Sequence, residues 1–175
     1  MKISFVHIPK NAGTSVLRAG VRCGHYWGEY THKMPDDIIP NSFTVVRNPY
    51  ARFVSMFYCN HNGYKGNPYT CDVDCFNRWI RDHIHDYPTQ SQYVYDSSKR
   101  QKITHILKFE NLKNEFEKLM KMWNLDIKLE EHEHKCSYDD TYTVHDINED
   151  TKTCIDTVCS DDFLFFGYSK TLHSV

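Results

Sequence analysis

Two short segments of the chain carry the residue types from which anion-binding sites are built. The first is Lys10–Ser15, where a lysine, three small residues and two hydroxyls follow an apolar, β-prone run at residues 3–7. Pro9 ends that run because it has no N–H for a strand ladder, and a helical spacing of apolar residues begins just after Ser15. Backbone N–H groups at a helix start, the positive end of the helix dipole and a lysine all favour an oxyanion. The candidate anion ligands are therefore Lys10, Asn11, Ala12, Gly13, Thr14 and Ser15.

Two interpretations of this first segment are open from its residues alone. It is not the loop of the nucleotide triphosphatases, in which Lys follows the second Gly, because Lys10 here precedes Gly13. It is either an anion-binding turn or an ordinary strand-to-helix turn capped by Thr14 or Ser15.

The second segment delivers an arginine where a strand passes into a helix. Residues 43–46 are β-prone, Arg47 follows them, and Asn48 and Pro49 suit a helix cap and a first helical position. Arg47 is thus expected at the carboxyl edge of a sheet, where open α/β sheets bind ligands. Ser55 comes about two turns along the next helix, and the pair Arg47 and Ser55 predicts a second anion site.

The composition of the chain limits the class of protein to which these two segments can belong. The 175 residues are 40% hydrophobic and 14% aromatic, so we expect one globular domain over residues 1–175. A formal net charge of −2 argues against a general nucleic-acid binder. No apolar run approaches the ~20 residues that cross a bilayer, and no signal peptide precedes the first strand. We therefore expect no membrane partner and a cytoplasmic location.

The seven cysteines match no compact zinc pattern. Cys71 and Cys75 come closest, but no second pair accompanies them, so reduced thiols are favoured over a metal site. A disulfide within residues 59–75 stays open. A metal site at His132, His134 and Cys136 is conceivable, yet a solvated charged face is favoured there. No metal is expected.

Hydrophobic periodicity predicts the remaining elements. Residues 24–42 lack a clean period and predict a loop with one short turn, and residues 58–75 predict a long excursion. Helices are expected at about 14–23, from 50 onward, at 75–85, from 112 onward and at 148–159, and a third strand at 103–109. The aromatic run at 163–168 is expected to pack the C-terminal segment onto the core. His7 is expected to be buried and satisfied.

The two segments together resemble a known family. HIPKNAGTS followed about 35 residues later by VVRNPYARFVSMF is similar to the sulfotransferases that use 3′-phosphoadenosine 5′-phosphosulfate (PAPS). The likeness is to the carbohydrate-type branch (sulfotransferase family 2-like), whose patterns resemble HIPKTAGTS and VRNPWDRLVS. It continues through QSQYVYD, LKFENLKNEFEKL and DDFLFFGY. Asn11, Tyr50 and Ala51 depart from the common Thr, Trp and Asp.

This resemblance implies a fold and a role for each candidate site residue. The fold would be α/β, a three-layer P-loop-like sandwich with a central, mostly parallel sheet flanked by helices. Lys10–Ser15 would hold the 5′-phosphosulfate, and Arg47 and Ser55 the 3′-phosphate. Lys10 would stabilise the departing bridging oxygen, and His32, in the loop between the motifs, would act as the base; His25 and Glu29 are rivals. The product nucleotide would be 3′-phosphoadenosine 5′-phosphate (PAP).

Three functional hypotheses stay open. The acceptor hydroxyl is expected on a carbohydrate, and the aromatic residues Tyr26, Trp27 and Tyr30 suit stacking on a sugar. They suit a tyrosine, a phenol or another small alcohol as well. The third hypothesis is a module that binds the nucleotide without turnover. The sequence does not indicate an oligomeric state.

Overall fold

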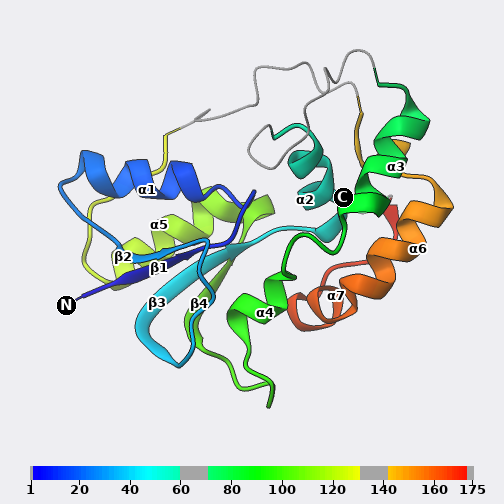
Figure 1. Cartoon of the computed structure of the whole chain (residues 1–175). Helices are drawn as coiled ribbons and strands as arrows, with labels where there is room; N and C mark the ends of the chain where they lie inside the picture. The colour runs from blue at the N-terminus through cyan, green and yellow to red at the C-terminus, as the bar shows by residue number, and fades with distance from the viewer. Residues whose placement is uncertain (1, 60–70, 131–141, 173–175) are drawn as a thin grey trace. The chain divides into compact units, whose positions relative to one another are not determined.

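The computed structural model describes residues 2–59, 71–130 and 142–172 (Figure 1). The chain divides into two compact units, each formed by two separate stretches of sequence. The sheet unit contains Met1–Arg47 and Gln90–Lys135, and the helical unit contains Asn48–Thr89 and Cys136–Val175. The single domain expected over residues 1–175 stays a prediction.

The sheet unit is built on four parallel strands in the order β2-β1-β3-β4. They are β1 (Ser4–His7), β2 (Gly28–Thr31), β3 (Ile39–Val46) and β4 (Ile103–Lys108). Because all pairings are parallel, the carboxyl ends of the strands share one edge, and the register places His7 beside Thr31 and Val46 beside Lys108. The α/β class with a parallel sheet flanked by helices is thereby confirmed.

Helices cover this sheet because alternate strand residues are large and apolar. Phe5 and Phe43 lie on one face, in a buried cluster with Val16 of α1 (Gly13–Arg22) and Phe116 of α5 (Leu112–Met122). Figure 1 shows α1 and α5 running beside the strands, and the short helix α4 (Gln90–Val94) belongs to the same unit. A 3₁₀ turn, η3 (Phe109–Asn111), joins β4 to α5. These contacts fix the turn between β1 and α1, which is the first candidate anion segment.

The loop predicted over residues 24–42 is wrong in two places. Strand β2 forms within it, and β3 begins at Ile39 rather than at residue 43. The four residues of β2 are mostly polar, and their ladder to β1 is a long-range contact that no local period reveals. Pro40 is exposed and lies where the β3–β4 register shifts, so its missing N–H is tolerated.

The helical unit contains three capped helices that the sequence predicts, α2 (Pro49–Phe57), α3 (Val73–His83) and α6 (Glu149–Val158). It also contains α7 (Ser160–Phe166), which the sequence did not predict as a helix, and a 3₁₀ turn η4 (Val144–Asp146). Side chains of Asn48, Asp72 and Asn148 accept hydrogen bonds from the first turns of α2, α3 and α6. Phe163 of α7 is buried against Tyr50, which confirms that the aromatic run packs into a core.

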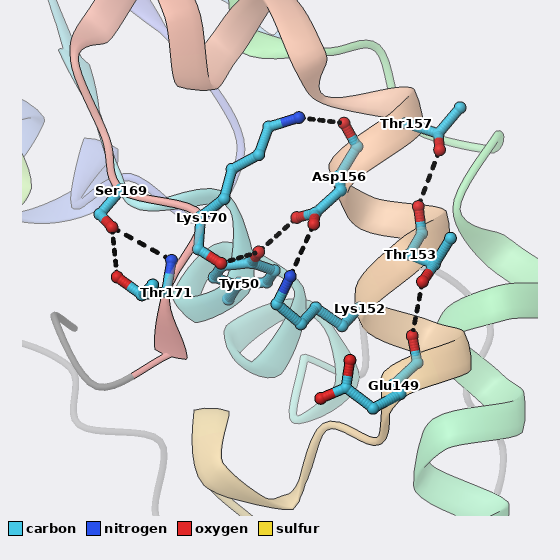
Figure 2. A network of polar contacts seen from close by, with 9 residues as sticks. All are labelled: Tyr50, Glu149, Lys152, Thr153, Asp156, Thr157, Ser169, Lys170 and Thr171. Atoms are coloured by element: carbon cyan, nitrogen blue, oxygen red, sulfur yellow. Dashed lines mark hydrogen bonds and ion pairs between the residues drawn. The ribbon is translucent and has the colours of Figure 1, made fainter.

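A polar network joins α2 to α6 and to the C-terminal segment of the helical unit (Figure 2). The Tyr50 hydroxyl donates to the Asp156 carboxylate and also lies 3.0 Å from the Lys170 carbonyl oxygen. Lys152 pairs with the same carboxylate at 2.7 Å. Burial and the adjacent Asp156 raise the pKa of Tyr50, so this phenol stays protonated and serves as a donor. Tyr50 therefore has a structural role in the helical unit.

The disulfide that the sequence leaves open within residues 59–75 is present between Cys71 and Cys75, so the favoured reduced thiols do not hold for this pair. Cys75 lies in the first turn of α3, and that turn brings the two Cα atoms within 5.5 Å. Cys23, Cys59, Cys154 and Cys159 are free thiols. Within the described ranges, the helices are all too short or too polar to traverse a lipid bilayer.

Candidate functional site

The turn between β1 and α1 has an unusual backbone. Lys10 (φ 68°) and Ala12 (φ 59°) both adopt the left-handed conformation, which costs a non-glycine residue about 1–2 kcal/mol. Ala12 is the N-cap of α1, and its side chain makes no capping hydrogen bond. Left-handed residues in such turns aim successive N–H groups into one concavity, an arrangement that binds anions. The backbone strain and the uncapped helix start favour the anion-binding interpretation over an ordinary capped turn.

Gly13 is required at the start of α1 by the side chain beneath it. A Cβ atom built on Gly13 would lie 1.8 Å from Cδ2 and from Nε2 of His7. Only a residue without a side chain therefore fits above this imidazole. The ring of His7 thus supports the turn from below.

His7 is buried, as the sequence predicts, but it is not satisfied. The residue is 8% exposed, and its Nδ1 has no hydrogen-bond partner among the described residues. Burial, then the neighbouring charges of His32 and Lys10, lower its pKa to about 4. His7 is consequently neutral at physiological pH.

His32 follows β2 and so reaches the same edge of the sheet as Lys10. Its N–H donates to the His7 carbonyl oxygen at 3.1 Å, and the two imidazole centroids are 4.5 Å apart. His32 itself is exposed and has a positive φ of 57°. A solvent-accessible imidazole is therefore held beside the Lys10 turn.

The two rival bases occupy other places in the sheet unit. His25 precedes β2, at the amino edge of the sheet, and packs on Trp27 at 4.5 Å between centroids. Burial lowers the pKa of His25. Glu29 lies within β2, paired with Phe5. Of the three candidates, only His32 lies beyond the carboxyl end of a strand.

Arg47 follows β3 and turns its guanidinium toward the first segment. Nη1 of Arg47 lies 3.3 Å from the Lys10 carbonyl oxygen and donates to it. The guanidinium carbon also lies 4.1 Å from the centroid of the Phe109 ring, within the range of a cation–π contact. Two cationic residues that are 37 positions apart in the chain are thus brought together at one edge of the sheet.

Asn11 is 1% exposed and uses its side chain inside the protein. Its amide Nδ2 donates to the Val45 carbonyl oxygen at 2.8 Å and to Gln90 Oε1 at 2.7 Å. An anion bound at this turn would therefore meet the backbone of Asn11 rather than its side-chain N–H groups. Thr14 is exposed and Ser15 half-buried at the start of α1.

The structure brings together Lys10–Ser15, His32 and Arg47 within the sheet unit. Ser55 lies half-buried in α2 of the helical unit, and its pairing with Arg47 stays a prediction. The sequence suggests Trp27 as a stacking surface for a sugar, but Trp27 cannot have this role. It is 8% exposed, and its indole donates to the Val16 carbonyl oxygen. Tyr26 is 79% exposed but precedes β2, at the edge opposite Lys10.

The sequence did not assign three residues to this site: His7 beneath the turn, Phe109 against Arg47, and Gln90 beside Asn11. The position of Phe109 at the carboxyl end of a predicted strand was a usable signal, because carboxyl ends of parallel strands meet at one edge. Gln90 begins the QSQYVYD segment of the resemblance, but nothing local indicated that it would lie beside Asn11 and Arg47, which are distant in the sequence.

Across the described ranges, no three His, Cys, Asp or Glu residues are grouped so that they could hold a metal ion. The segment with His132, His134 and Cys136 lies outside the described residues. No protein-family model, curated protein or solved structure matches the chain.

Proposed function

We propose that this chain is a PAPS-dependent sulfotransferase built on a three-layer P-loop-like sandwich. It would move a sulfuryl group from PAPS to an acceptor hydroxyl and release PAP. The proposal combines the sequence resemblance with the arrangement of cationic groups at the carboxyl edge of the sheet. We also propose that the protein is soluble and cytoplasmic, and that it has no metal, nucleic-acid or membrane partner.

The observation that carries the proposal is the contact between the Arg47 guanidinium and the Lys10 carbonyl group. PAPS has a phosphosulfate at its 5′ end and a phosphate at its 3′ position, so it needs two cationic sites within the span of one nucleotide. The turn after β1 and the residue after β3 provide two such sites on adjacent strands. Ser55 would add a hydroxyl to the 3′-phosphate site.

Lys10 and the backbone N–H groups of the turn would perform the electrostatic part of the reaction. The bond between sulfur and the bridging oxygen breaks, and the negative charge that develops on that oxygen is stabilised by the Lys10 ammonium group. The sulfuryl group carries less charge than a terminal phosphoryl group, so one lysine with several N–H groups can fill the role that magnesium fills in kinases.

His32 would accept the proton of the acceptor hydroxyl as that oxygen forms its new bond to sulfur. Its exposed ring at the edge of the sheet is open to an incoming acceptor. His7 is neutral at physiological pH, so it places no positive charge beside the proposed base, whose ring centroid is 4.5 Å away. A carbohydrate is the proposed acceptor, on the strength of the resemblance.

The test is transfer of radiolabelled sulfate from PAPS to panels of glycans and of phenols, tyrosine included. Transfer to glycans is expected. Transfer to phenols alone would show that the acceptor is a phenol and not a carbohydrate. His32→Ala is expected to abolish transfer and leave PAP binding nearly unchanged, and Lys118→Ala, an exposed change on α5, to alter neither. Intact PAP binding without any transfer would contradict both enzyme hypotheses and favour the binding module.

A further inference from the structure

Gln90 is buried at the junction of the two candidate anion segments. It begins α4 and is 0% exposed. Its side-chain amide makes three hydrogen bonds to residues that lie at least 43 positions away. These bonds join two residues, Asn11 and Arg47, and a buried glutamine bonded to both fixes them relative to each other.

One side of this amide holds the backbone of Arg47. Gln90 Oε1 accepts from the Arg47 N–H at 2.8 Å, and Gln90 Nε2 donates to the Arg47 carbonyl oxygen at 2.8 Å. Arg47 lies just beyond the last register pair of β3 and β4, which is Val46 with Lys108. The side chain of Gln90 thus continues the hydrogen bonding of the sheet where the strand ladder ends.

The other side of the amide holds the Lys10–Ser15 turn. Gln90 Oε1 also accepts from Asn11 Nδ2 at 2.7 Å, and the same Asn11 nitrogen donates to the Val45 carbonyl oxygen. Asn11 is flanked by Lys10 and Ala12, the two residues with left-handed backbone conformations. Gln90 therefore supports the strained part of the turn.

These contacts close a ring. Lys10 is joined covalently to Asn11, Asn11 donates to Gln90, Gln90 pairs with the Arg47 backbone, and the Arg47 guanidinium returns to the Lys10 carbonyl oxygen. A displacement of either anion segment can therefore be transmitted to the other through these buried and part-buried hydrogen bonds.

We propose that Gln90 is a positioning residue that couples the Lys10–Ser15 turn to Arg47, so that the 5′ and 3′ groups of one nucleotide are bound by a single preorganised unit. This inference rests on the proposed function. It assigns Gln90 no contact with the nucleotide. Its effect is transmitted through Asn11 and through the backbone of Arg47.

The test compares the affinities for PAP and for AMP, which lacks the 3′-phosphate, by calorimetry. In Gln90→Met, which keeps the size of the side chain but not its polar atoms, we expect the preference for PAP over AMP to fall about tenfold. Gln92→Met, an exposed change on the same helix, should leave that preference as in the wild type. An unchanged preference in folded Gln90→Met overturns the inference, whereas a wild type that does not prefer PAP contradicts the proposed function instead.

Two further measurements apply if Gln90→Met does not fold. Gln90→Glu keeps both accepted hydrogen bonds and loses the donation to the Arg47 carbonyl oxygen, so its PAP preference should also fall. In the wild type, NMR titration with AMP should shift the Gln90 side-chain amide and the Arg47 backbone amide, although AMP has no group for Arg47 to bind. Absence of both shifts overturns the coupling without any variant.

Discussion

A methyl group on Gly13 would lie 1.8 Å from two atoms of the His7 ring, and this close approach ties the candidate anion-binding turn to the first strand. His7 is part of a parallel sheet and is buried, so the ring cannot easily move aside. The turn above it must therefore keep its backbone close to the imidazole.

Gly13→Ala should consequently lower the free energy of unfolding by about 3 kcal/mol, at the upper end of overpacking effects. Gly24→Ala is the matched control: Gly24 has a φ of 69° but open space around a Cβ atom, so only about 1 kcal/mol of backbone strain is expected. Urea denaturation measures both.

The cause of that loss is tested by a double-mutant cycle. In a His7→Ala background, the cost of Gly13→Ala should fall by more than about 1 kcal/mol, since the clashing ring is gone. Strictly additive effects would show that the close contact does not determine the cost.

The buried His7 also predicts a pH dependence of stability. Its folded pKa of about 4 lies below the unfolded value of 6.5, so the unfolded chain binds the extra proton as the pH falls. The contribution of neutral His7 to the free energy of unfolding is complete above pH 6.5. It is lost as the pH falls from 6.5 to 4, and the total loss is about 3 kcal/mol.

This contribution is measured as the difference between the unfolding free energies of wild type and His7→Gln from pH 7 to pH 4. The wild-type curve should fall more steeply. His85→Gln, at an exposed histidine, should follow the wild type. Parallel curves for wild type and His7→Gln would show that His7 titrates normally.

Lys10 and Arg47 should differ in which kinetic parameter they control. Lys10→Ala removes the cation beside the leaving oxygen and should lower kcat by about 10²–10³ with a smaller change in PAP affinity. Arg47→Ala should weaken PAP binding about tenfold or more and change kcat less. Steady-state kinetics and calorimetry separate the two, with exposed Arg18→Ala on α1 as the control. Equal effects on both parameters in both variants would contradict this division.

The Cys71–Cys75 disulfide should stabilise the protein modestly, because it closes a very short loop. The double variant Cys71→Ser/Cys75→Ser is expected to lose about 2 kcal/mol, whereas Cys23→Ser, at an exposed free thiol, should lose little. Denaturation with and without reductant measures this.

Intact mass under non-reducing conditions shows whether the bond is present. Free thiols at both positions in freshly isolated protein would contradict the disulfide. The same measurement bears on the predicted cytoplasmic location, where such bonds are rare.

Local signals account for much of the fold. Asn48 followed by Pro49 marks the start of α2, and the alternation of large apolar residues around Phe43 marks a central strand. Such features depend on neighbours in sequence, so they can be read from it.

Features that depend on distant partners could not be found in this way. Strand β2 exists because of its pairing with β1, and Gln90 has its role because Asn11 and Arg47 surround it. The disulfide likewise depends on how the chain enters α3. For the site, Lys10, His32 and Arg47 were named from the sequence, whereas the residues that support them were not.

The central claim is that the turn after β1 and Arg47 bind one nucleotide with phosphate-bearing groups at both ends. Calorimetric titration of the wild-type protein with PAP and with AMP tests it most directly. We predict that PAP binds at least about tenfold more tightly than AMP, because Arg47 adds a charge-assisted contact to the 3′-phosphate. No binding of PAP, or equal affinity for the two nucleotides, would contradict the claim.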